Sequence, residues 1–236
     1  MEIYIEDKKN LYILIHKFLE DSDELNKDDA KKDYFPKLSN EGDVDEMRQF
    51  LKIIKSIGEY HHRDPNFNER INKILLHYKD QIKGSLSNNE IFHIFENNKK
   101  IVHFLLKENI ITISDDICTE MMNKVENNGK QYCHFFIPEL EKFVGKEKIE
   151  SVKNDLQKED PTILMKYEEK REEGENDSFI CSLIRQDSVE EFIAYVNRHN
   201  ISPTSTIVPS IFETNSFLIE NNNPTLIEYS AFFGSI

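Results

Sequence analysis

Glycine and proline are scarce in this sequence. Seven of each make 14 of the 236 residues, about 6%, where proteins contain about 12% on average. This shortage argues against turn-rich all-β folds and against collagen-like chains. Hydrophobic residues are also few, at 38%, but 16 Phe and 9 Tyr are too many aromatic residues for a disordered chain. We therefore expect a folded protein.

Cysteine and long apolar segments are nearly absent as well. The three cysteines, Cys118, Cys133 and Cys181, are widely spaced and form no CxxC pattern, which indicates neither a disulfide framework nor a zinc site. The longest apolar runs have five residues, at 11–15 and 192–196, whereas a membrane-spanning helix needs roughly 20. The first residues are acidic where a secretory signal would be basic. These features predict a soluble, cytoplasmic protein with reduced thiols.

Positive charge is in short supply. The sequence has 30 basic and 44 acidic residues, which gives a formal net charge of −14. Nucleic acids and anionic membranes would repel such a chain at long range. We therefore expect neither a nucleic acid nor a membrane as a partner.

Helical periodicity is the feature that is present almost everywhere. Two apolar stripes show it best, one in the range 47–54 and one in the range 67–82. Helix starts are expected at Asp43, Ser188 and Ser210, each followed three residues later by Glu, and at Asp160, which precedes a proline. The spacing predicts an all-α protein with a dozen or so helices, in which 21–45 is mainly a loop.

Internal similarity points to a degenerate repeat. Residues 97–109 (NNKKIVHFLLKEN) and 186–196 (QDSVEEFIAYV) share a turn residue followed by an apolar helix. The turn positions Asn98, Gly145, Asp187 and Gly234 are 47, 42 and 47 residues apart. In 225–234 (TLIEYSAFFG), Thr225 and Glu228 have the spacing of a capping box, and Gly234 permits a left-handed turn.

These stretches, together with 128–135 (NGKQYCHF), resemble ankyrin repeats. The range 174–236 is similar to the divergent ankyrin proteins that are greatly expanded in parasitic protists, and the similarity weakens toward the N-terminus. The resemblance implies a helical solenoid of ankyrin-like pairs at 87–236, preceded by an N-terminal helical region at 1–86. It also implies a protein-binding function without known catalysis, and further ankyrin repeats beyond Ile236.

Ankyrin repeats present the two residues before each inter-helix turn to their partner. The resemblance therefore nominates three pairs of partner-binding residues: Glu96 and Asn97, Arg185 and Gln186, and Phe232 and Phe233. The alternative for the arginine and glutamine is a plain solvated position, and for the phenylalanines it is packing against a neighbouring helix. If the last repeat is incomplete, Leu226, Tyr229 and Phe233 should lack part of their cover.

Enzyme motifs are weak by comparison. The sequence contains no glycine-rich phosphate loop, no HExxH and no G-x-S-x-G. His61 and His62 are adjacent, so they point in different directions on a helix, and Cys133 and His134 fit a core position and a cap. The mixed charges of 166–173 are typical of a solvated helix face.

We therefore expect a non-enzymatic interaction module with no catalytic residue, no cofactor and no metal. Two alternatives stay open. One is a self-assembly element that forms homo-oligomers, and the other is a helical enzyme without a recognised motif.

Overall fold

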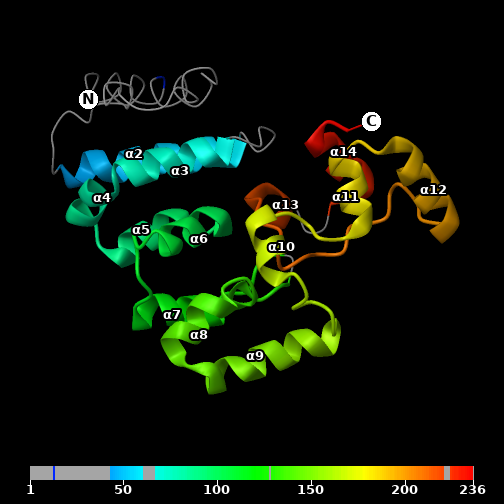
Figure 1. Cartoon of the computed structure of the whole chain (residues 1–236). Helices are drawn as coiled ribbons and strands as arrows, with labels where there is room; N and C mark the ends of the chain where they lie inside the picture. The colour runs from blue at the N-terminus through cyan, green and yellow to red at the C-terminus, as the bar shows by residue number, and fades with distance from the viewer. Residues whose placement is uncertain (1–12, 14–42, 61–66, 128, 221–223, 236) are drawn as a thin grey trace. The chain divides into compact units, whose positions relative to one another are not determined.

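The computed structural model describes residues 13, 43–60, 67–127, 129–220 and 224–235. In these ranges it contains thirteen α-helices, one 3-10 helix and no β-strand beyond two isolated bridges (Figure 1). The predicted all-α class is confirmed for this part of the chain, while the arrangement as a solenoid of ankyrin-like pairs stays a prediction. No helix in the described ranges is long and apolar enough to span a lipid bilayer.

The helices pack as two compact units. The first holds the described residues up to 96 together with 101–112, and the second holds 97–100 together with the described residues from 113 onward. This division reports packing, so it does not test the predicted start of a repeat region at 87.

The first unit is built from two apolar stripes that the sequence predicts. It contains α2 (Val44–Tyr60), α3 (Phe67–His77), α4 (Lys79–Ser85), α5 (Asn88–Phe95) and most of α6 (Lys99–Lys107). Phe50 and Ile54 of α2 are fully buried, and the ring of Phe50 meets that of Tyr78 edge-on at 4.8 Å. The second stripe crosses a helix break, because α3 ends just before Tyr78 and α4 begins just after it.

The second unit contains the remaining helices: α7 (Asp115–Asn123), η1 (Tyr132–His134), α8 (Ile137–Val144), α9 (Lys146–Glu159), α10 (Tyr167–Glu173), α11 (Phe179–Arg185), α12 (Val189–His199), α13 (Ser216–Glu220) and α14 (Leu226–Phe233). Turns with positive φ join α8 to α9 at Gly145 and α11 to α12 at Asp187, and another follows α14 at Gly234. Three of the four predicted turn positions thus have the left-handed backbone that glycine and Asn/Asp tolerate best.

The predicted helix starts have mixed outcomes. The Asp43 side chain accepts hydrogen bonds from the backbone N–H groups of Asp45 and Glu46, as expected of a cap. α12 does follow Ser188, but the Ser188 side chain makes no capping bond. No helix begins at Ser210, whose hydroxyl instead donates to Asp177 and accepts from the Phe212 N–H.

Asp160 is a further correction. Its side chain accepts bonds from the N–H and the hydroxyl of Thr162, and turns follow it until α10 begins at Tyr167. The Asp-Pro pair therefore starts a turn, not the expected helix.

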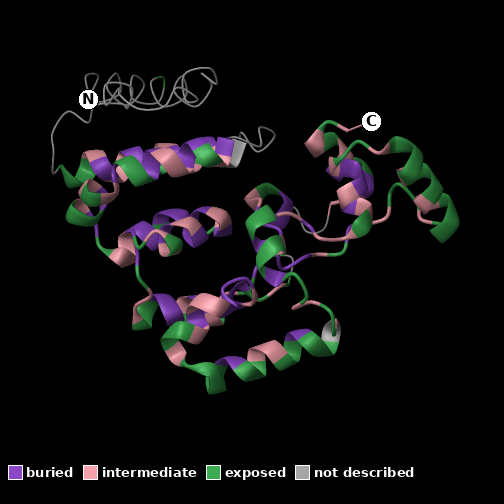
Figure 2. Cartoon of the chain, viewed as in Figure 1, coloured by how far each residue is buried: buried purple, intermediate pink, exposed green. Residues whose placement is uncertain are grey.

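α14 and α12 differ in burial in a way that the sequence did not predict. The predicted capping box is present, since Thr225 and Glu228 bond reciprocally, and Leu226 and Tyr229 are buried. By contrast α12 has no buried residue, and Figure 2 shows it in the colours of exposed and intermediate residues. The expectation that Leu226 and Tyr229 lack cover is therefore wrong, because α11 and the chain around Ile207 pack against them.

The charged run 166–173 is also not a purely solvated face. Arg171 is 1% exposed and Tyr167 is buried. Both terminal nitrogens of Arg171 bind carboxylates, at 2.7 Å and 2.8 Å from the two oxygens of Glu139 and at 3.0 Å from Glu168. A charge run cannot reveal that Glu139, 32 residues earlier, comes within reach.

Candidate functional site

The first pair of predicted partner-binding residues is divided between the units. Glu96 is half-buried, and its carboxylate lies 3.1 Å from Nδ1 of His93 in the first unit. Asn97 is exposed, and its side-chain oxygen accepts a hydrogen bond of 2.8 Å from Lys124 in the second unit.

The second pair lies at the end of α11 and has two different environments. Arg185 is half-buried and donates to the backbone oxygen of Asn176 and to the hydroxyl of Tyr229, at 2.8 Å each. Gln186 is exposed in the turn before α12. Gln186 is therefore accessible, while Arg185 ties α11 to α14.

The third pair packs within the unit. Phe232 stacks on Phe217 with centroids 5.5 Å apart, and Phe233 contacts the ring of Tyr229 at 4.7 Å. Both phenylalanines are half-buried against the apolar cluster of α11 and α14. The structure thus brings Arg185, Phe232 and Phe233 together around Tyr229, on the side where α11 meets α14.

Next to this cluster lie two glutamates that the sequence did not single out. Glu213 is 4% exposed, and Glu175 is half-buried. The Oε2 atoms of both are buried without a hydrogen-bond partner among the described residues. Oε1 of Glu213 accepts a bond of 2.9 Å from the backbone N–H of Asn215.

The surroundings of Glu213 favour its neutral form. Burial, reinforced by the charge of Glu175, raises the pKa of Glu213 to about 8. Lys99 and Arg185 oppose this shift but do not cancel it. Burial also raises the pKa of Glu175.

The two nearby cations are engaged elsewhere. Lys99 is 1% exposed, with its Nζ 2.8 Å from Glu126 and 3.1 Å from the backbone oxygen of Ile211. Arg185 binds Asn176 and Tyr229, as described above. Consequently no residue in the described ranges forms an ion pair with Glu213.

A small cavity of about 20 Å³ lies beside this glutamate, lined by Glu213, Asn176, Ser210, Tyr229 and four apolar residues. Its volume suits about one water molecule. The cavity therefore offers solvation to the polar groups but no room for a larger ligand.

Two of the three thiols, Cys133 and Cys181, are held in their protonated form. Burial raises the pKa of Cys133 and of Cys181 to about 11, so both thiols stay protonated near neutral pH. Burial of Cys133 agrees with its predicted core position. His61 and His62 lie outside the described residues.

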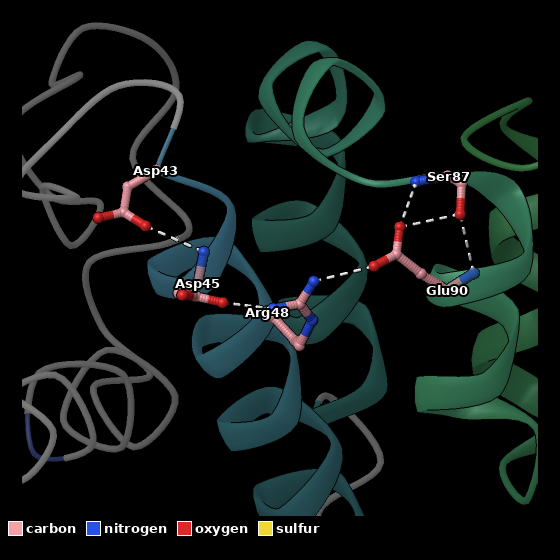
Figure 3. A network of polar contacts seen from close by, with 5 residues as sticks. All are labelled: Asp43, Asp45, Arg48, Ser87 and Glu90. Atoms are coloured by element: carbon pink, nitrogen blue, oxygen red, sulfur yellow. Dashed lines mark hydrogen bonds and ion pairs between the residues drawn. The ribbon is translucent and has the colours of Figure 1, made fainter.

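The first unit contains a polar network that the sequence did not reveal. Arg48 of α2 contacts Asp45 and donates to Glu90 of α5 at 2.9 Å, while Glu90 forms a capping box with Ser87 (Figure 3). The bond from Arg48 and those from Ser87 lower the pKa of Glu90 to about 2. The Ser-x-x-Glu spacing at 87–90 carried the signal for the cap, but nothing in the sequence indicated Arg48.

Comparisons with protein-family models, with curated proteins and with solved structures find no match. The resemblance to ankyrin proteins therefore stays a prediction.

Proposed function

We propose that the chain is a protein-interaction module, a scaffold or adaptor built from ankyrin-like helix pairs, that acts in the cytoplasm without catalysing a reaction. The proposal rests on the resemblance of 174–236 and on the exposure of α12 and of Phe179 at the start of α11.

The main support for the proposal is the exposure of α12. This helix has no buried residue, yet Val189 and Ile193 are apolar and exposed, at 40% and 53%. Phe179 at the start of α11 is also exposed, and Gln186 lies in the turn between the two helices. Exposed apolar side chains beside polar ones are typical of surfaces that bind another protein.

The charge of the chain restricts the partner. A net charge of −14 favours association with a protein that presents basic residues. Glu190 and Glu191, in the first turn of α12, are exposed next to Val189 and add local negative charge. We therefore expect a partner whose contact surface combines apolar and basic side chains.

A photo-crosslinking amino acid at Ile193 tests this proposal. We expect a specific covalent adduct with another protein when the variant is expressed in its native cell, and the adduct should weaken as salt is raised. The matched control is the same substitution at Lys158 of α9, whose side chain is 75% exposed. Equal adducts at both positions, or none at Ile193, would argue against this surface.

Self-assembly is the second candidate, because the same exposed residues could meet a second copy of the chain. Sedimentation at increasing concentration distinguishes the two. An adaptor for another protein should remain monomeric, whereas a self-assembling chain should shift to larger species, and Ile193→Asp should prevent that shift.

A further inference from the structure

Glu213 lies in a segment of irregular chain, 205–215, that separates α12 from α13. The segment is packed inward, because Ile207, Ile211 and Phe212 are all buried. It is not part of any helix, so its attachment depends on contacts with other parts of the second unit.

Most of these attachments are hydrogen bonds to fixed partners. The N–H and the hydroxyl of Thr214 both donate to the backbone oxygen of Gly174, at 3.0 Å and 2.7 Å. The N–H of Ile207 donates to Pro224, and the Asn176 side chain donates to the backbone oxygen of Val208, at 2.9 Å each.

At Gly174 the segment lies so close to the backbone that a side chain would meet Thr214. Gly174 has φ +71°, and a Cβ there would lie 3.0 Å from Oγ1 of Thr214. The segment is therefore seated tightly beside Glu213, so the carboxyl group has little freedom to turn toward bulk water.

Five titratable groups of the described residues interact electrostatically with Glu213. Glu175, Lys99 and Arg185 act on its charge as stated above. Burial raises the pKa of Cys181 of α11 and of Tyr229 of α14, and a charge on Glu213 adds to both shifts. An ionised Glu213 would thus be a buried negative charge beside another carboxylate, with its two nearest cations bound to other groups.

We propose that Glu213 is held as a neutral carboxyl group in the folded chain, and that its ionisation loosens the 205–215 segment from the second unit. The buried Oε2 atom without a partner, the engaged Lys99 and Arg185, and the tight seat at Gly174 all support this assignment. Opening of the segment moves the carboxylate into water, where it ionises at its ordinary pKa. The segment is therefore a pH-sensitive latch, and its opening exposes its own buried residues Ile207, Ile211 and Phe212.

The linkage between proton binding and opening fixes the size and sign of the effect. The opened segment ionises near pH 4.5 and the closed one near pH 8. Between these values the closed form holds one more proton, so raising the pH favours opening by about tenfold for each pH unit. Above about pH 8 both forms are ionised, and the opening equilibrium levels off.

Hydrogen exchange of the intact chain, corrected for the intrinsic effect of pH, measures this opening. The protection of the Ile207 and Thr214 amides should fall about tenfold per unit between pH 5 and pH 8 and then level off. Amides of α9 in the same unit serve as the internal reference. Wild-type protection that does not change with pH would overturn the proposal.

Three variants sharpen the test. Glu213→Gln should remove the pH dependence, and Glu175→Gln should move the levelling-off to lower pH because it removes a repulsive charge. The exposed Glu220→Gln, the same chemical change on α13, should behave as the wild type. Two results would overturn the proposal. One is that Glu213→Gln keeps the full dependence of amide protection on pH, and the other is that Glu175→Gln does not change the pH at which protection levels off. Either result would mean that another group titrates.

Discussion

Glu90 in the first unit and Glu213 in the second are the same residue type in opposite surroundings. The Glu90 side chain is 43% exposed and is bound by Arg48 and Ser87, and its pKa is lowered to about 2 (Figure 3). Glu213 is buried and without a cation partner, and its pKa is raised to about 8. Burial without a cation partner therefore favours the neutral form of Glu213, whereas hydrogen bonds from a cation and a hydroxyl favour the ionised form of Glu90.

The two units use arginine differently as well. Arg48 is one third exposed and holds the starts of α2 and α5 together, whereas Arg171 is 1% exposed and is held between Glu139 and Glu168. Its guanidinium also lies over the rings of Phe135 and Tyr167, at 5.2 Å and 5.7 Å. When one partner of a buried ion pair is removed, the remaining charge is buried without compensation. When one partner of an exposed pair is removed, water solvates the remaining charge.

Arg171→Ala should therefore have the largest effect. We expect it to lower the free energy of unfolding by about 3–5 kcal/mol, because it removes the buried guanidinium that binds Glu139 and Glu168 and opens a gap beside two aromatic rings. Arg48→Ala should lower the free energy of unfolding by much less, because Arg48 is one third exposed. Denaturant unfolding measures both, and Arg198→Ala on exposed α12 is the control. Equal losses for Arg171→Ala and Arg48→Ala would break the contrast between the units.

The pH dependence of stability should be the second largest effect. Between about pH 4.5 and pH 8 the folded state binds one more proton at Glu213 than the unfolded state does. Stability should therefore fall as the pH rises, by about 1.4 kcal/mol per unit from this group, and Glu213→Gln should remove that slope. Unfolding midpoints measured at several pH values check this, and an unchanged slope in the variant would contradict it.

The sequence predicted what depends on local spacing. The stripes of α2 and α3, the caps at Asp43 and Thr225 and the turn at Gly145 all follow from residues within one or two helical turns. Ser210 carried the same Ser-x-x-Glu signal, but its hydroxyl found Asp177, 33 residues earlier, and no helix formed. Local patterns therefore fail where a distant partner competes for the same polar group.

The same reason explains the missed groups in the candidate site. The local sequence offers Glu168 to Arg171, but it does not indicate that Arg171 also binds Glu139 or that Glu213 has no cation partner. Glu139 lies 32 residues before Arg171, and the distant Lys99 is engaged by Glu126 and by the backbone oxygen of Ile211. Of the predicted partner-binding residues, Asn97 and Gln186 are exposed, while Arg185, Phe232 and Phe233 have internal contacts.

Acid conditions should affect Glu90 in the opposite sense. Its folded pKa of about 2 lies below the ordinary 4.5, so the unfolded state binds more protons between these values. Stability should fall as the pH drops through this window, and Glu90→Gln should weaken the fall. The effect should be modest because the group is exposed. If Glu90→Gln loses stability at low pH as steeply as the wild type does, the network with Arg48 does not contribute to the stability of the fold.

The smallest effect concerns α12 and α14 within the second unit. Since α12 has no buried residue while α14 buries Leu226 and Tyr229, the amides of α12 should exchange faster. Exchange followed by mass spectrometry on the peptides 189–199 and 226–233 measures this. Slower exchange in α12 would indicate that another surface covers it in solution.

Titration of the two glutamate side chains tests the central claim most directly. With the carboxyl carbons labelled, NMR of one sample should give a midpoint near pH 2 for Glu90 and near pH 8 for Glu213. A Glu213 midpoint near the ordinary value of 4.5 would contradict the account, because it would mean that the buried carboxylate is compensated after all.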